Sequence, residues 1–251
     1  MITSLQNERV KLTHALQNQA KARRKEGKIA LEGVRLLRDA CEQRHVPEFV
    51  FYTAKADPEL LRDLEARRFA LFEVSDEVMR HISATEEPPG VVGVFPTPQP
   101  TLPEHPQRVL ILDAIRDPGN MGTLLRTAAA AGVQAVLLSP ACVDPYNPKA
   151  LRGGMGAHFR IPLAAQSWPQ IAAYCRECAV YLADGAGDVD YDRADWSRAW
   201  ALVIGSEAHG AGDESRRLAH ARITIPMAAH TESLNAAAAA AVILFHALRS
   251  P

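Results

Sequence analysis

The chain has 251 residues, of which 47% are hydrophobic and 23% are charged, with a formal net charge of -1. This composition excludes a disordered chain, and the length allows one large core or two modest ones. No stretch approaches the roughly 20 apolar residues of a membrane helix, and residues 6–8 are polar where a signal peptide would be apolar. We therefore expect a cytoplasmic protein.

The first helical pattern, residues 11–22, lies in a basic region. Residues 1–28 contain seven lysines and arginines against two glutamates. Such a region attracts a polyanion, although on charge alone a solvated helix face is the favoured interpretation. The candidate nucleic-acid contacts in this region are Lys21, Arg23, Arg24 and Lys25.

Further patterns predict a small α/β domain over residues 1–95. They indicate a helix at 34–42, a strand at 49–52, a helix at 58–67 and a strand at 91–95. Five prolines then make residues 96–106 the expected linker. The second domain would span residues 107–251.

In the second half, apolar runs alternate with helical patterns, which predicts an α/β fold with a parallel sheet covered on both faces. A last helix, from about residue 234 to 248, contains six consecutive alanines that suit close helix packing. The expected strands are 109–112, 135–138, 180–183, 202–204 and 223–225.

Polar loops follow three of these strands. The first, Asp117-Pro-Gly-Asn-Met-Gly-Thr-Leu-Leu-Arg126, is broken by glycines and leads into a helix. The second carries Glu207 in a glycine turn. In the third, Ser233 stands where a helix N-cap is expected. Because the carboxyl ends of parallel strands meet at one edge, these loops mark a candidate site.

Two other segments have plainer alternatives. The long connection 139–156 carries Lys149 and Arg152 and could be functional or simply a surface loop. Cys175 and Cys178 form a C-x-x-C in a helical pattern over 171–181, without the further ligands of a zinc site. We expect buried thiols and no metal.

Three motifs together resemble the SpoU/TrmH family of the SPOUT superfamily. They are Asp117-Pro-Gly-Asn-x-Gly-x-x-x-Arg126, Gly205-x-Glu207-x-x-Gly210 and Ile225-Pro-Met-x-x-x-x-Glu-Ser-Leu-Asn235. Asp144-Pro-Tyr-Asn-Pro-Lys149 is similar to a segment of the family's ribosomal-RNA members. Leu31-Glu-Gly33 and Pro89-Gly90-Val-Val-Gly93 resemble pieces of its auxiliary RNA-binding domain, which is related to ribosomal protein L30e. The chain departs from the family pattern at Ala229, His230, Gly154 and Pro89.

The resemblance implies a carboxyl-terminal domain with a deep trefoil knot and a homodimer through that domain. It implies methyl transfer from S-adenosylmethionine to a ribose 2'-hydroxyl of RNA, most simply ribosomal RNA. The implied catalytic residues are Asn120, Arg126, Glu207, Ser233 and Asn235. The implied cofactor residues are Ser139, Gly205, Ile225, Met227 and Leu234, and Arg116, Lys149 and Arg152 join the basic cluster as RNA contacts.

Arg126 is the residue that the resemblance places at the reacting hydroxyl. A guanidinium holds its proton too tightly to act as a base, so we expect it to grip phosphate and stabilise a developing alkoxide. Water or phosphate would then take part of the proton.

Other functions remain open. They are transfer-RNA methylation, RNA binding without catalysis, and nucleotide chemistry on a Rossmann sheet. The last is disfavoured because the G-x-G-x-x-G fingerprint is absent.

Overall fold

A computed structural model describes residues 1–206, 210–228 and 233–249. The chain forms two compact units. Unit 1 comprises residues 1–99 and 146–159, and unit 2 comprises residues 100–145 and 160–251. Segment 146–159, which sequence analysis placed in the second domain, therefore belongs to unit 1, and the chain passes between the units three times.

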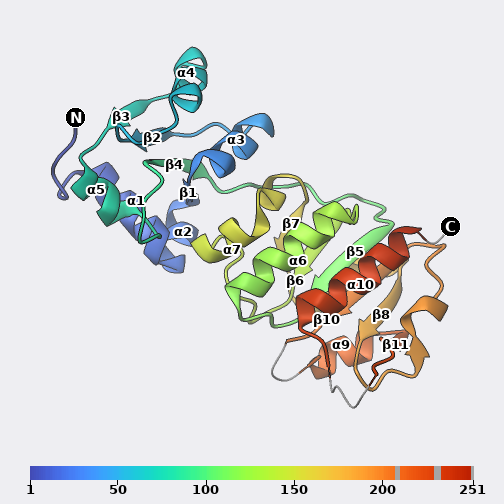
Figure 1. Ribbon diagram of the computed structural model, residues 1–251. Helices are drawn as coiled ribbons and strands as arrows, with labels where there is room; N and C mark the ends of the chain where they lie inside the picture. The colour runs from blue at the N-terminus through green and yellow to red at the C-terminus, as the bar shows by residue number, and fades with distance from the viewer. Residues whose placement is uncertain (207–209, 229–232, 250–251) are drawn as a thin grey trace. The chain divides into compact units, whose positions relative to one another are not determined.

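Unit 1 is built on a four-stranded sheet in the order β1-β4-β2-β3 (Figure 1). Only β2 and β3 pair in parallel. Helices cover both faces of the sheet, because apolar side chains form one cluster on each. The elements are α1 (Glu8–Asn18), α2 (Ala20–Glu26), β1 (Lys28–Glu32), α3 (Val34–Glu42), β2 (Phe49–Tyr52), α4 (Pro58–Ala66), β3 (Leu71–Glu73), α5 (Asp76–Ile82), β4 (Val91–Pro96), α7 (Pro148–Gly154) and the 3-10 turn η1 (Ala157–Phe159).

The helix expected over residues 11–22 is two helices, because Gln19 takes an extended conformation between α1 and α2. The Arg23 guanidinium donates to the carbonyl of Leu16 at 2.6 Å and so satisfies an acceptor that the end of α1 leaves open. Sequence analysis also missed β1, β3 and α5. The other elements that it expected in this half are present within two residues of the predicted bounds.

Segment 146–159 packs into the apolar core of unit 1. Leu151 and Phe159 join a cluster that contains Leu36 and Leu37 of α3. Gly156 has φ +81 and lies directly against Asp39. A Cβ there would come within 2.8 Å of the Asp39 Cγ and 2.9 Å of its Cβ, so rotation of the Asp39 side chain cannot relieve the contact.

We expect Gly156→Ala to destabilise the protein by about 2–4 kcal/mol, since it combines a left-handed backbone with overpacking. Thermal unfolding should shift down by roughly 5–15 °C. Gly27→Ala is the matched control, because Gly27 has φ +61 and a Cβ there would meet nothing within 4 Å. Equal melting temperatures for the two variants would contradict the packing of segment 146–159 on α3.

Unit 2 contains a seven-stranded sheet in the order β7-β6-β5-β10-β8-β11-β9, with every neighbouring pair parallel. Helices α6 and α10 lie side by side over one face of the sheet (Figure 1). The elements are β5 (Arg108–Leu112), α6 (Pro118–Ala130), β6 (Ala135–Leu138), β7 (Leu163–Ala165), α8 (Trp168–Tyr174), β8 (Ala179–Ala183), β9 (Val189–Asp190), the 3-10 turn η2 (Tyr191–Arg193), β10 (Trp200–Ile204), α9 (Asp213–Leu218), β11 (Ala221–Thr224) and α10 (Ala236–Arg249).

All five strands expected in this half are present, and the parallel sheet is confirmed. The helical pattern over 171–181 was wrong in its second half, because α8 ends at Tyr174 and residues 179–183 form β8. The apolar run of β8 is buried on both faces, and sheet pairing overrides its local helical spacing. Within the described ranges, no helix has the length and hydrophobicity needed to span a membrane.

Candidate active site

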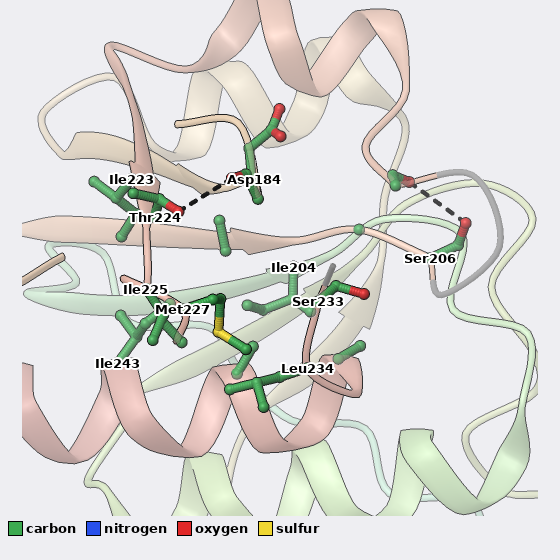
Figure 2. Close-up of a pocket in the computed structure, with 16 residues that line it drawn as sticks. Asp184, Ile204, Ser206, Ile223, Thr224, Ile225, Met227, Ser233, Leu234 and Ile243 are labelled. Carbon is green, nitrogen blue, oxygen red and sulfur yellow. Dashed lines mark hydrogen bonds between the residues drawn. The ribbon is translucent and has the colours of Figure 1, made fainter. Parts of the chain in front are cut away.

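A cavity of about 270 Å³ lies at the carboxyl ends of β8, β10 and β11, beside the start of α10 (Figure 2). This edge of an open parallel sheet is where ligands bind. Four segments line the cavity: Ala183 to Gly185 after β8; Ile204, Gly205, Ser206 and Gly210 at β10; Ile223, Thr224, Ile225 and Met227 at β11; and Ser233, Leu234, Ala236, Ala239 and Ile243 at α10.

The walls of this cavity are mainly apolar. Met227 and Leu234 lie at its mouth and keep 38% and 39% of their surface exposed. The isoleucines and alanines of the four segments line the remaining apolar surface. Backbone amides and carbonyls at the strand ends supply polar groups next to these side chains. Such a pocket suits a flat heteroaromatic ring with hydrogen-bonding edges.

Among the described residues that line the cavity, Asp184 is the only one with a carboxylate, and this carboxylate is paired with a group outside the cavity. In Figure 2 the carboxylate points away from Met227 and Ser233. It accepts a hydrogen bond from Arg216 at 3.2 Å. Asp184 therefore links the end of β8 to α9.

Gly205 shapes one wall, because the chain returns directly over it. Ser206 and Gly210 exchange two backbone hydrogen bonds of 3.0 and 2.9 Å. A Cβ on Gly205 would lie 2.5 Å from the Gly210 carbonyl carbon and 2.6 Å from the Ala211 nitrogen. Only glycine fits beneath this returning backbone.

An amide pair joins the first and third motif loops. The Asn235 Nδ2 donates to the Asn120 Oδ1 at 3.2 Å, across 115 residues of chain. The Asn235 Oδ1 accepts from the Ala237 nitrogen at 2.9 Å and from the Ala238 nitrogen at 3.4 Å. Asn235 therefore caps α10, whereas sequence analysis gave that role to Ser233.

The residues expected around the cofactor and the hydroxyl are only partly assembled at the cavity. Gly205, Ile225, Met227, Ser233 and Leu234 line it. Arg126 is exposed on α6 and is not among the lining residues. Glu207, Ala229 and His230 lie outside the described residues.

Two predicted site residues have structural roles instead. Ser139 is buried and donates to the Asp113 carboxylate at 3.0 Å, so it does not line the cavity. The family resemblance implied that Ser139 contacts the cofactor, whereas its hydroxyl is bound to a protein carboxylate. Arg23 is only 5% exposed and is used in the hydrogen bond to Leu16, so it is not available to RNA.

The other predicted RNA contacts are mostly at the surface. Lys21, Arg24 and Lys25 are exposed on α2 of unit 1, and Lys149 is exposed on α7 of the same unit. Arg152 is half-buried, and its Nη1 is buried with no hydrogen bond to any described residue. Arg116 is exposed in unit 2.

Sequence analysis missed Asp113, which directly follows β5. This carboxylate is only 5% exposed and is bound by three donors. A charged residue at the end of a fully apolar run was the available signal, because a buried charge is kept only where it is paired or hydrogen-bonded.

Cys175 and Cys178 are both buried between α8 and β8. The neighbouring Cys178 thiol and burial both raise the pKa of Cys175, which keeps this thiol protonated. Among the described residues, no group of three or more histidine, cysteine, aspartate and glutamate side chains could hold a metal ion.

Comparison with known proteins identifies relatives over both units. The family model described as the SpoU rRNA Methylase family matches residues 107–245, and the MRM3-like substrate binding domain matches residues 7–93. The chain is 35% identical to rRNA methyltransferase 3, mitochondrial, of Mus musculus, over 90% of this chain and 68% of that protein. It is 30% identical to the 23S rRNA (guanosine(2553)-2'-O)-methyltransferase RlmP of Bacillus subtilis, over 98% of each.

A solved structure is similar over nearly the whole chain. It is the SpoU methyltransferase AviRb from Streptomyces viridochromogenes in complex with AdoMet. The TM-score is 0.90 at 26% identity, and the match covers 97% of this chain and 98% of AviRb. The family match over more than half of the chain, together with these relatives, shows that the chain belongs to the SpoU rRNA methylase family.

Proposed function

We propose that the chain transfers a methyl group from S-adenosylmethionine to a ribose 2'-hydroxyl of ribosomal RNA. The observation that carries the proposal is the Asn120–Asn235 hydrogen bond, since it joins the first motif to the third beside the cavity. Family membership and the rRNA methyltransferases among the relatives support the substrate class.

The residues of the cavity fit S-adenosylmethionine. Ile204, Ile225 and Leu234 supply apolar surface for adenine, and backbone groups near Gly205 supply partners for its polar edges. Gly205 lets the chain from Gly210 return directly over the end of β10, and this returning backbone forms part of the cavity wall. When bound, the cofactor supplies the methyl group on a sulfonium.

The chain's own residues would then align the ribose and help to remove its proton. We assign Asn120 and Asn235 to orienting the ribose. Arg126 would bind an RNA phosphate and stabilise the negative charge that develops on the 2'-oxygen. Ser233, at the edge of the cavity, would help to position the hydroxyl. Glu207, which the second motif places at the same site, would help to position Arg126 and the hydroxyl. Proton removal falls to water or an RNA phosphate, because a guanidinium is a poor base.

Unit 1 would hold the RNA. Its match to the MRM3-like substrate binding domain and the exposed cations of α2 support this role. Lys21, Arg24 and Lys25 lie in one short helix, and lysine and arginine clusters contact phosphate without reading sequence. Lys149 would add a contact, whereas half-buried Arg152 is a weaker candidate than the motif suggested.

The family resemblance also leads us to propose a knotted methyltransferase domain that dimerises through α10. The sheet order, in which β10 lies between β5 and β8, supports the knot. Val242, Phe245 and Leu248 support the dimer, because they lie on one face of α10 and are each 38–42% exposed. A second copy of the chain would cover this face.

We expect Phe245→Asp to convert a dimer into a folded monomer in sedimentation equilibrium, since a charge at an apolar interface is costly. Val46→Asp is the matched control, because Val46 is also apolar and is 58% exposed, in unit 1. A monomeric parent protein, or a Phe245→Asp variant that stays dimeric, would contradict the α10 interface.

Mapping ribose methylation in ribosomal RNA from cells with and without the protein tests the proposed function. We expect one or a few 2'-O-methyl positions to disappear from ribosomal RNA. Loss from transfer RNA alone would favour the tRNA alternative. No change in either RNA, with S-adenosylmethionine binding absent from the purified protein, would favour an RNA-binding role without catalysis.

A further inference from the structure

Asp113 is a buried carboxylate at the centre of unit 2 that the proposed mechanism does not use. Its backbone nitrogen donates to the Ile204 carbonyl at 2.9 Å, which places it beside the ends of both β5 and β10. Its side chain is shielded from water, and burying a carboxylate is expensive unless donors surround it. The segments that carry its hydrogen-bond donors are therefore the ones that this carboxylate holds in place.

Two of its donors, Gly212 and Ser215, follow the second motif in sequence. The third donor, Ser139, directly follows β6. The Asp113 Oδ2 accepts from the Gly212 nitrogen at 2.8 Å and from the Ser215 Oγ at 2.7 Å. The Oδ1 accepts from the Ser139 Oγ at 3.0 Å. Hydrogen bonds to a charged acceptor are about twice as strong as neutral ones.

Ser139 connects Asp113 to the turn before the first motif. The same Ser139 Oγ accepts from the Ala114 nitrogen at 3.1 Å, and Ala114 has φ +52. A non-glycine residue rarely adopts this conformation, so the bond helps to hold it. Asp113 and Ser139 together therefore fix the turn that leads from β5 to Asp117, the cap of α6.

The hydrogen bond from Gly212 to Asp113 holds the chain that forms one wall of the cavity. Backbone hydrogen bonds join Ser206 to Gly210, and the chain from Gly210 passes over Gly205. Two residues further on, the Gly212 nitrogen donates to Asp113. Both ends of the second motif loop are thus anchored, one by β10 and the other by this carboxylate. One buried side chain sets the distance between this loop and the β5–α6 turn.

We propose that Asp113 is a positioning residue that aligns the cofactor wall at Gly205 and Gly210 with the β5–α6 turn before Asn120. Its own contacts are with protein groups, so it acts through the loops that it holds. The kinetic part of its test rests on the proposed function, whereas the hydrogen-exchange part does not.

The first readout is hydrogen exchange of the Gly212 amide in the absence of cofactor. Asp113→Ala should raise its exchange rate about 10-fold to 100-fold, as expected for the loss of a bond to a charged acceptor. The same variant should weaken S-adenosylmethionine binding at least 10-fold in calorimetry and lower kcat. Asp113→Asn should restore most of both properties, because its amide oxygen can face Gly212 and Ser215 while its nitrogen donates to Ser139.

Glu32→Ala is the matched control for simple loss of stability. Glu32 is a buried carboxylate of unit 1, 8% exposed, that accepts from the Ala84 nitrogen at 2.9 Å and the Thr85 Oγ1 at 2.7 Å. It should lower the melting temperature but leave Gly212 exchange and S-adenosylmethionine affinity unchanged.

Ser215→Ala keeps the test decisive should Asp113→Ala fail to fold. It removes one donor and should move Gly212 exchange and cofactor affinity in the same directions by roughly 3-fold to 10-fold. The proposal is overturned if Gly212 exchange and affinity stay within threefold of the parent in the folded alanine variants, or if Asp113→Asn is as impaired as Asp113→Ala. Normal Gly212 protection but no methyl transfer in the parent protein would contradict the proposed function and leave the anchoring role standing.

Discussion

Gly205→Ala is expected to weaken S-adenosylmethionine binding about 100-fold while the protein remains folded. The added methyl group would overlap the backbone of Gly210 and Ala211, at 2.5 to 2.7 Å, and backbone cannot rotate away as a side chain can. The returning loop must move, and with it one wall of the cavity. A distortion of about 3 kcal/mol corresponds to a roughly 100-fold loss of affinity in calorimetry.

Gly210→Ala is the control in the same loop. Gly210 has φ +64, but a Cβ there would meet no described residue within 4 Å, so we expect this variant to carry only the backbone cost of about 1–2 kcal/mol. Its affinity should fall about 10-fold at most. A Gly205→Ala variant that binds S-adenosylmethionine within threefold of the parent would show that the cofactor does not use this wall.

Arg126→Lys is expected to keep S-adenosylmethionine binding and lose most turnover. Arg126 is exposed on α6, less than two turns after Asn120. Because it does not line the cavity, cofactor affinity should not depend on it. Lysine keeps the charge but lacks the planar fork that grips phosphate at two points. Removing one such stabilising group typically lowers kcat about 100-fold to 1,000-fold.

Measurement of single-turnover rates and calorimetric affinity separates these two effects. Arg198→Lys serves as the control, since Arg198 is exposed in the same unit and pairs with Asp195 at 3.3 Å. It should leave both quantities unchanged. Full activity of Arg126→Lys would mean that the guanidinium has no special role in the reaction.

The central strands of unit 2 could be predicted because their signal is local. In β5, β6 and β10 nearly every residue is apolar and buried, as a parallel sheet covered on both faces requires. The edge strands β7 and β9 have three and two residues and partly exposed side chains, so no periodicity marks them. Strand order depends on long-range pairing that no local pattern contains.

The placement of segment 146–159 could not be predicted for a similar reason. Its helix was interpreted as part of the methyltransferase domain because it lies between β6 and β7 in sequence. Its apolar residues, Leu151 and Phe159, instead find their partners in unit 1. Sequence shows that such residues need a core but not which one.

At the site, sequence placed the motif loops at one sheet edge but not the contacts within them. Gly205, Ile225 and Leu234 line the cavity, and their contact with the cofactor stays a prediction of the family resemblance. The capping role of Asn235 was missed, because serine and asparagine are equally good caps and helix starts are uncertain by one or two residues. The hydrogen bond from Ser139 to Asp113 could not be predicted either, because the two residues are distant in sequence.

Methyl transfer by the purified protein tests the central claim most directly. Ribosomal RNA from cells that lack the protein is incubated with it and with S-adenosylmethionine labelled in the methyl group. The account predicts label in ribosomal RNA, on ribose, as a nucleotide whose 3' phosphodiester resists alkali because its 2'-oxygen is methylated. Label on a base, or none in ribosomal RNA under conditions where the protein binds S-adenosylmethionine, would contradict it.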